Sequence, residues 1–494
     1  MRFSLRWGFI HWVGFYTWVG SILRLWGLWY SNRWYDEIFT SWSALLPFER
    51  MVAATAGDVH PPGYYALVWL VAHLTGSNAV WLLRLPSALL SIAAIPLLAQ
   101  IGRRLKLSDT AILWAVAFMA LSQFQIYYGQ ETRMYALLQL EVLGAVLAVL
   151  ERRWWLLAVC ASAMLWTHNY GAIYCALIFL VALVQEIRMP VTADPPGPVC
   201  NLPALIGSGA AALLSYMPWV PTLIRQLRAV GNWWQQPTTP GGFLEPIQQF
   251  VWGNPLGILT PISQVLVFAL VAFATFRAVR LRLNALVPVM AFAPMLISVA
   301  TEWVGMHPTY LYRTFIGSSG FLYLLIGWGL DTVKAAQLRR LTLAAVAPMF
   351  AISTLLYYPV VKASKGATDD FILAVASQAQ PGDFIYHMNP GSLMAFREKY
   401  PDQPERYMWV HPAMPNDIGT LSSPTLAAFG VHQVELEDIP WRRAWLIFSA
   451  GPTLGTAEDA EVLRLVDEFH GQPLLDYSLW FSKIYRGQIW LLKR

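Results

Sequence analysis

The hydrophobic positions of this chain fall into long runs over the first 360 residues, and short polar segments separate these runs. A helix that crosses the hydrocarbon core of a bilayer needs about 20 largely apolar residues. The pattern predicts a polytopic, mainly α-helical membrane protein. We expect eleven transmembrane helices, over residues 8–30, 79–102, 110–128, 133–150, 153–168, 170–187, 202–220, 257–276, 284–304, 310–330 and 341–360.

The pattern changes after residue 360, where short polar and apolar stretches alternate. Their spacing predicts helices over 369–380 and 457–470 and strands over 383–387, 444–449 and 488–492. A segment of roughly 130 residues can bury a core of its own. We therefore expect two domains: a transmembrane domain over 1–360, with an outward loop over 31–78, and a soluble α/β domain over 361–494.

Composition and charge support a membrane protein. Hydrophobic residues make up 56 % of the chain and charged residues 13 %, whereas a soluble domain has about 25 % charged residues. Of the 22 lysines and arginines in residues 1–360, 14 fall in loops that lie inside if the N-terminus is cytoplasmic. We expect an inner (plasma) membrane protein with an extracytoplasmic C-terminal domain. Because the basic residues stand in short runs between spans, they indicate topology and no nucleic-acid partner.

Two acidic residues, Asp36 and Glu37, follow the first predicted span directly. The stretch 38–46 after them is amphipathic and suited to lie on the membrane surface, which would hold both carboxylates at headgroup depth. A carboxylate there could take a proton from a hydroxyl nucleophile or bind a metal ion. The alternative is the start of a solvated loop, and the residues alone leave both interpretations open.

A second polar cluster, Asp58 and His60, precedes two prolines and an apolar helix predicted over 66–74. In an extended segment, side chains two residues apart point the same way, so this pair could bind a divalent ion or a phosphate. The alternative is that Asp58 caps the following helix, but the cap position should lie nearer Pro61. We therefore favour a functional pair.

A third polar cluster lies at the outer turn between the third and fourth predicted spans and includes Tyr128, Glu131, Arg133 and Tyr135. A planar guanidinium at headgroup depth is suited to grip a phosphate. On a helix, Glu131 and Tyr135 would share one face, as would Gln130 and Arg133. The alternative is an ion pair between Glu131 and Arg133 that ties two spans together.

His168 and Arg313 stand at two further outer turns. Arg313 is a second candidate for phosphate binding, whereas a lone histidine at a turn is more often hydrogen-bonded within the bundle. All these polar groups fall on the predicted outer side of the membrane. A transporter would place charges at mid-depth within broken helices. The one-sided arrangement therefore favours an active site for a lipid-phosphate substrate.

The polar clusters lie within four characteristic stretches: Asp36-Glu37, DVHPPGYYALVW (58–69), RLPSALLSIAAIPLLAQIGRRL (84–105) and YYGQETRMYALL (127–138). With these stretches the chain resembles the dolichyl-phosphate-mannose–protein mannosyltransferase-like group of the GT-C superfamily, which are bacterial integral-membrane glycosyltransferases. The resemblance is dense over residues 30–185 and extends as a general layout to residue 360. It implies a bundle of about a dozen helices whose outward loops form the active site.

The resemblance also implies an activity: transfer of a sugar from a polyprenyl-phosphate carrier to an extracytoplasmic glycan, lipid or protein, with inversion. Asp36 would be the general base on the acceptor hydroxyl, and Glu37 would help it or cap the next helix. Asp58 and His60 match the family's second acidic motif, where a divalent metal ion could bind. Arg133 would hold the lipid phosphate. Further substrate-binding residues are expected at Tyr128, Glu131, Tyr135, His168 and Arg313.

Two other functions share some of these features. An envelope-lipid transferase that moves phosphate-linked groups other than sugars would need the same phosphate grip. A flippase or transporter of polyprenyl-linked lipids would need charged residues along a path across the bilayer. The cytoplasmic halves of the predicted spans hold almost none.

Overall fold

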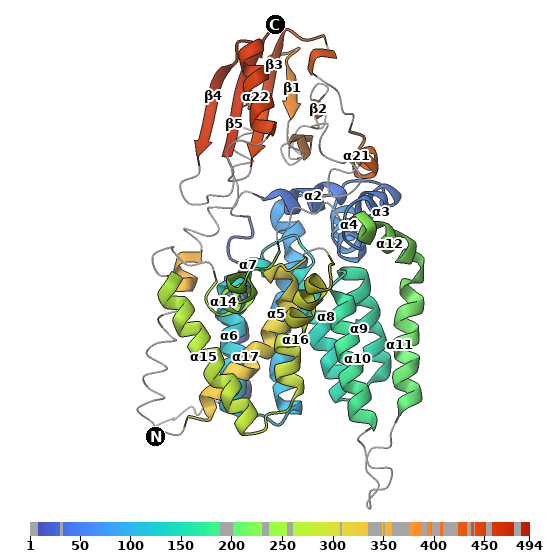
Figure 1. The fold of residues 1–494 in the computed structure, drawn as a ribbon, viewed down its shortest axis with the longest axis vertical. Coiled ribbons are helices and arrows are strands. Elements are labelled where there is room, and N and C mark those ends of the chain that lie inside the picture. Colours follow the sequence, from blue (N-terminus) through green and yellow to red (C-terminus); the bar gives the residue numbers. More distant parts are fainter. Residues whose placement is uncertain are drawn as a thin grey trace, which may run out of the picture. The chain divides into compact units, whose positions relative to one another are not determined.

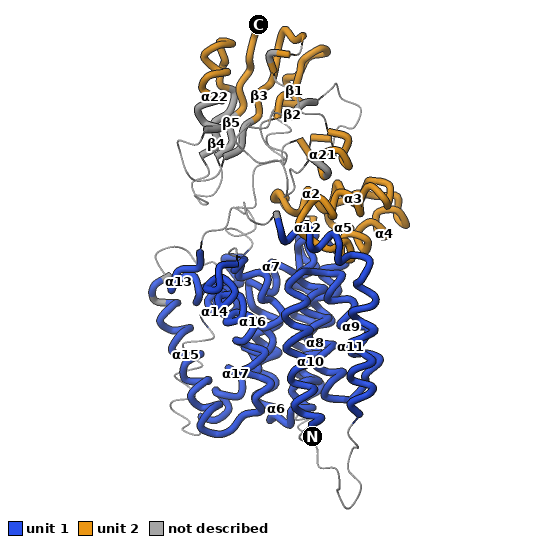
Figure 2. Tube along the Cα trace, turned by 45° about the vertical axis from the view of Figure 1, so that its right-hand side comes forward, with its two compact units in different colours: residues 1–28, 84–357 blue, residues 29–83, 358–494 orange. Residues whose placement is uncertain are grey.

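The computed structural model describes residues 8–29, 33–187, 201–229, 237–253, 260–306, 309–333, 348, 351–357, 375–387, 393–394, 396–397, 406–408, 423–431, 436–438, 440–450, 457–478 and 486–494. The chain divides into two compact units (Figure 2). Unit 1 comprises Met1–Leu28 and Arg84–Tyr357, and unit 2 comprises Trp29–Leu83 and Tyr358–Arg494.

Unit 1 is a bundle of long helices that run side by side (Figure 1). Its longer helices are α1 (Phe9–Leu25), α5 (Val80–Arg104, from Arg84 on), α6 (Asp109–Leu121), α7 (Gln123–Gly129), α8 (Tyr135–Leu150), α9 (Trp154–Thr167), α10 (Gly171–Ile187), α11 (Leu202–Tyr216), α15 (Thr260–Arg280), α16 (Leu286–Trp303) and α17 (Ile316–Asp331). Short helices at the connections are η1 (Met217–Trp219), α12 (Val220–Ala229), α13 (Pro240–Phe243), α14 (Glu245–Val251) and η4 (Tyr312–Phe315).

The number of predicted membrane crossings is not confirmed. Among the described residues, three helical stretches are long and apolar enough to cross a membrane: Val80–Arg104, Ser263–Arg280 and Leu286–Trp303. The pair α6 and α7 makes a fourth if the two helices form one span, bent by 53°. Helices α8, α9 and α10 have 16, 14 and 17 residues, or about 21–26 Å, less than the roughly 30 Å of hydrocarbon. The predicted span 341–360 lies mostly outside the described residues.

The core of unit 1 is centred on α17, whose residues are almost all buried. It packs against α6, α8, α15 and α16. At Gly327, a Cβ atom would lie 2.3 Å from the carbonyl oxygen of Ala111 on α6. Glycine is therefore required here, because it allows the two backbones to approach closely in a tightly packed bundle.

The break between α6 and α7 is held by a buried arginine. Ser122 leaves the helical conformation (ψ 128°), so that carbonyl groups at the end of α6 lose their helical partners. The guanidinium of Arg24 on α1 donates to the carbonyl oxygens of Met119 at 2.7 Å and Ala120 at 3.0 Å. A second group on α5, the Ser91 hydroxyl, accepts from Arg24 at 2.7 Å. The positive charge at a helix C-terminus is favourable, and it fixes the direction in which α7 leaves.

Unit 2 joins the loop Trp29–Leu83 to the C-terminal segment. The loop forms α2 (Tyr35–Ser43), α3 (Phe48–Gly57) and α4 (Gly63–Thr75), and α21 (Ser423–Phe429) packs on them. Phe429 stacks on Trp42 with ring centroids 4.1 Å apart, and the Thr425 hydroxyl donates to the Ala54 carbonyl oxygen at 3.2 Å. Ile38 to Ser43 are all buried, so the apolar residues of α2 pack against protein. That α2 lies on the membrane surface stays a prediction.

The rest of unit 2 is a mixed sheet with a helix on it. The strands are β1 (Phe384–His387), β2 (Arg406–Met408), β3 (Arg443–Ala450), β4 (Gln472–Ser478) and β5 (Arg486–Lys493), in the order β2-β1-β3-β5-β4. β1 is parallel to β2 and β3, whereas β5 is antiparallel to β3 and β4. Leu465 and Phe469, at the end of α22 (Ala457–Glu468), share a core with Leu446 and Leu492. The predicted α/β character is confirmed.

Candidate functional site

The turn that carries Arg133 is not helical, contrary to one interpretation of its spacing. α7 ends at Gly129 and α8 begins at Tyr135, so Glu131 and Arg133 lie in a connecting turn. Both are buried. The Gln130 amide nitrogen donates to the carbonyl oxygens of Leu23, Arg24 and Trp26 at 2.8–3.1 Å, and the Ser87 hydroxyl donates to the Arg133 carbonyl oxygen at 3.2 Å. The turn is thereby fixed to α5 and to the end of α1.

Arg313 reaches the same place from a distant part of the chain. It lies on η4, and its Nε donates to the phenolic oxygen of Tyr135 at 2.8 Å. The ring of Tyr135 also lies edge-on to Tyr128, with centroids 4.9 Å apart, and 6.1 Å from the ring of His168. Four of the predicted substrate-binding residues therefore form one contiguous cluster in unit 1.

A hydrogen bond sets the tautomer of neutral His168. Its Nδ1 accepts from the backbone N–H of Tyr170 at 3.0 Å, so Nδ1 carries no proton and Nε2 carries it in the neutral ring. The turn between α9 and α10 is tight, because a Cβ on Gly171 would lie 2.2 Å from the Met164 carbonyl oxygen. Behind it, the Thr167 hydroxyl donates to the buried carboxyl of Glu141 at 2.9 Å. His168 can therefore donate through Nε2 from a fixed position.

Two residues near this cluster were missed by sequence reasoning. Tyr312 on η4 is hydrogen-bonded to Tyr128 and lies beside the charge of Arg313. Glu245 is the first residue of α14, and part of its side chain is exposed to solvent. The protein that surrounds the rest of the side chain raises the pKa of its carboxyl, and the charge of Arg313 acts in the opposite direction. Tyr312 could have been found in the sequence because it directly precedes Arg313. Glu245 could not, because it is a single acid within a long connection.

Further connections in the described part of unit 1 are fastened to the helices. The Glu302 carboxylate at the end of α16 accepts from the backbone N–H and the hydroxyl of Thr238, at 2.9 and 2.8 Å. Tyr170 donates to the Thr309 carbonyl oxygen at 2.8 Å, and Tyr310 donates to the Phe243 carbonyl oxygen at 2.7 Å. These bonds hold the segment leading to Arg313 in place.

In unit 2, Asp36 and Glu37 lie in the first turn of α2, where the helix dipole favours carboxylates. Trp34 occupies the N-cap position, so Glu37 does not cap the helix as expected; it lies inside the first turn and is fully buried. Asp36 is partly exposed. It therefore has the better access to a substrate hydroxyl.

Asp58 and His60 also come together, as predicted. Asp58 is the residue that ends α3, in an extended conformation, and its Oδ2 lies 3.2 Å from Nδ1 of His60. Asp58 does not cap α4, because Pro62 occupies that position. Within the described ranges, no group of three His, Cys, Asp or Glu side chains could hold a metal ion. The pair supplies two ligands, and further ones would have to come from water or substrate.

Part of the chain matches a known protein family. Residues 59–200 match the model of the dolichyl-phosphate-mannose-protein mannosyltransferase family. The resemblance predicted from the sequence is thereby confirmed for this part of the chain. The matched segment holds the turns of Arg133 and His168, whereas Asp36, Asp58 and Arg313 lie outside it.

Solved structures extend the likeness to the whole fold. The chain is similar to the crystal structure of ArnT from Cupriavidus metallidurans in the apo state, with a TM-score of 0.60 and 13 % identity over 98 % of both chains. It is also similar to ArnT from the same organism bound to undecaprenyl phosphate, with a TM-score of 0.56 and 13 % identity over 97 % of this chain and 98 % of that one. The chain therefore shares its overall fold with ArnT. No curated protein sequence matches the chain.

Proposed function

We propose that the protein is an integral-membrane glycosyltransferase of the inner membrane. It moves a sugar from a polyprenyl-monophosphate carrier to an extracytoplasmic glycan, lipid or protein. The observation that carries this proposal is the cluster of Arg313, Tyr135 and His168 beside the buried turn of Arg133. The family match over 59–200 and the fold of an ArnT structure that holds undecaprenyl phosphate support it.

In this proposal unit 1 binds the donor phosphate. The Tyr135 phenol fixes the plane of the Arg313 guanidinium through Nε, so that the terminal nitrogens are the ones that meet phosphate oxygens. Arg133 supplies the second positive charge, and His168 donates from Nε2. These donors stabilise the negative charge that develops on the carrier phosphate as it leaves the anomeric carbon.

Unit 2 supplies the base. Asp36 takes the proton of the acceptor hydroxyl, whose oxygen bonds to the anomeric carbon as the bond to the phosphate oxygen breaks. A single displacement of this kind inverts the anomeric configuration and needs no covalent intermediate. Asp58 and His60 hold the connection before α4, where they can bind substrate or a divalent ion. The packing of α21 on α2 and α3 supports a role of the C-terminal segment in holding the base.

The test is a donor panel. The purified protein in nanodiscs is incubated with polyprenyl-monophosphate sugars and with membrane extract as the source of acceptors. Mass spectrometry then detects released polyprenyl phosphate. We expect release from one donor, a strongly reduced rate of release in Asp36→Asn, and a reduced rate at limiting donor in Arg133→Ala. No release from any donor would contradict the proposal, and donor binding without turnover would point to the transporter.

A further inference from the structure

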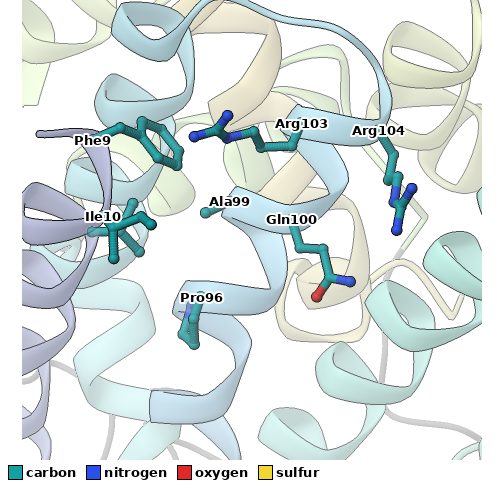
Figure 3. Close-up of a pocket in the computed structure, with 8 residues that line it drawn as sticks. Phe9, Ile10, Pro96, Ala99, Gln100, Arg103 and Arg104 are labelled. Atoms are coloured by element: carbon teal, nitrogen blue, oxygen red, sulfur yellow. The ribbon is translucent and has the colours of Figure 1, made fainter.

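Unit 1 has a cavity of about 600 Å3 far from the donor-binding residues. It lies between the start of α1, at Phe9, Ile10 and Val13, and the end of α5 (Figure 3). Ser87, whose hydroxyl contacts the Arg133 backbone, is 16 residues before Arg103 on α5, which corresponds to about 24 Å. The cavity is therefore a separate feature, at the opposite end of the bundle.

One stripe of α5 forms a wall of this cavity. The wall residues stand at positions i, i+3, i+4, i+7 and i+8 and thus share one face of the helix: Pro96, Ala99, Gln100, Arg103 and Arg104. The stripe is apolar and small at one end and cationic at the other. With the aliphatic side chains of α1 opposite, it makes a groove with an apolar floor and a positively charged rim.

The two arginines at the rim point to different sides (Figure 3). The Arg103 guanidinium lies over the ring of Phe9, 4.1 Å from its centroid. The carboxylate near it is Asp109, at 4.0 Å, with both side chains more than half exposed, so the pair is weak. Arg103 therefore retains most of its positive potential at the mouth of the groove.

Arg104 shares its carboxylate with a second arginine. Glu151 lies 2.7 Å from Arg104 and 3.1 Å from Arg153, and the Gln100 amide also donates to it at 3.0 Å. One carboxylate charge therefore balances only one of the two arginine charges. The rim of the groove is therefore net positive. It lies at the end of the bundle that the distribution of lysines and arginines predicts to face the cytoplasm.

We propose that this groove binds an anionic phospholipid of the cytoplasmic leaflet. The lipid phosphate meets Arg103 and Arg104, and an acyl chain lies on Phe9, Ile10 and Val13. Charge complementarity selects this occupant, because basic pockets between helices at the cytoplasmic surface bind anionic headgroups, and a zwitterionic lipid would gain less. The site is independent of the sugar transfer.

The test uses the full-length protein in detergent with equal amounts of phosphatidylglycerol and phosphatidylcholine, and native mass spectrometry counts the retained lipids. We expect preferential retention of phosphatidylglycerol, and a loss of about five-fold in its affinity for each arginine removed in Arg103→Gln and Arg104→Gln. The matched control is Arg280→Gln with Arg282→Gln, which removes the same charge at the same end of the bundle, at the end of α15 and just after it.

A second variant keeps the charges and fills the groove. Val13→Trp should also lower phosphatidylglycerol retention, with the arginines in place, and the melting temperature in detergent shows that each variant is folded. Loss confined to the groove variants supports the site. Equal loss in the Arg280 and Arg282 variant, or equal retention of both lipids by the unaltered protein, overturns it.

Discussion

In unit 1 most candidate residues are cationic or aromatic, whereas in unit 2 three of the four are acidic: Asp36, Glu37 and Asp58. The unit 1 residues come from separate parts of the chain, since Arg313 binds Tyr135 across 178 residues. The unit 2 residues come from the short stretch 36–60 and are supported by α21. Cationic donors suit the binding of a phosphate, and a partly exposed carboxylate suits proton abstraction. Substitution of the unit 1 residues should therefore weaken donor binding, and substitution of Asp36 should slow proton abstraction without weakening donor binding.

The largest effect is expected for Asp36→Asn. An amide cannot accept the proton of the acceptor hydroxyl, so kcat should fall by about 10²- to 10⁴-fold, while the affinity for the donor stays unchanged. Release of polyprenyl phosphate measures kcat, and a tritium-labelled donor measures binding. Glu49→Gln, an exposed acid in the first turn of α3, is the control and should keep full activity. Turnover by Asp36→Asn at the rate of the unaltered protein would exclude Asp36 as the base.

The next largest effect concerns the support of α2. Phe429→Ala removes the ring that stacks on Trp42 and should lower the free energy of unfolding of unit 2 by about 3–5 kcal/mol. Differential scanning fluorimetry and limited proteolysis detect this loss. Leu463→Ala, at a position on α22 that is 64 % exposed, should change little. Equal stability of both variants would mean that α21 does not hold α2 in solution.

A smaller effect is expected for the phosphate-binding arginines. Arg133→Ala or Arg313→Ala should weaken donor binding about ten- to hundred-fold, because each removes charge-assisted hydrogen bonds. Arg313→Lys keeps the charge but loses the planar fork that Tyr135 orients, and should fall in between. Isothermal titration with the intact donor provides the affinities. If these variants bind the donor normally and lose only kcat, the assigned division of roles is wrong.

The smallest effect concerns Glu245. Its pKa is raised in the folded protein, so the folded state binds protons more tightly than the unfolded state. The contribution of Glu245 to stability should therefore be greatest below the unfolded pKa of about 4.3 and should be lost as the pH rises through the folded pKa. Glu245→Gln removes this contribution, so its melting temperature should depend less on pH between 4 and 7. A parallel pH profile for both proteins would rule out the raised pKa.

Much of the architecture could be predicted because apolar runs and alternation are local signals. Three of the five strands follow from such runs, whereas β4 contains Pro473 and Asp476 and β2 has three residues. The bend at Ser122 lies inside an apolar run, and only the distant Arg24 shows how its carbonyls are paired. Long-range packing of this kind has no local pattern.

The candidate site also contains features that local sequence predicts and features that depend on tertiary structure. Asp58 and His60 were predicted to meet because they are two residues apart, and they do. Arg313 was predicted on chemical grounds, but its bond to Tyr135 depends on tertiary structure. The packing of α21 on the outward loop was missed, since 31–78 and 361–494 were expected in separate domains. It depends on aromatic contacts between segments far apart in the chain.

The most direct test measures donor binding and donor cleavage on the same nanodisc samples of Asp36→Asn and Arg133→Ala. We expect Asp36→Asn to bind the polyprenyl-phosphate sugar as tightly as the unaltered protein and to release polyprenyl phosphate about 10²- to 10⁴-fold more slowly. We expect Arg133→Ala to lose affinity for the donor and to keep some turnover at saturating donor. Loss of donor binding in Asp36→Asn, or normal binding in Arg133→Ala, would contradict the assignment of base and phosphate grip to different units.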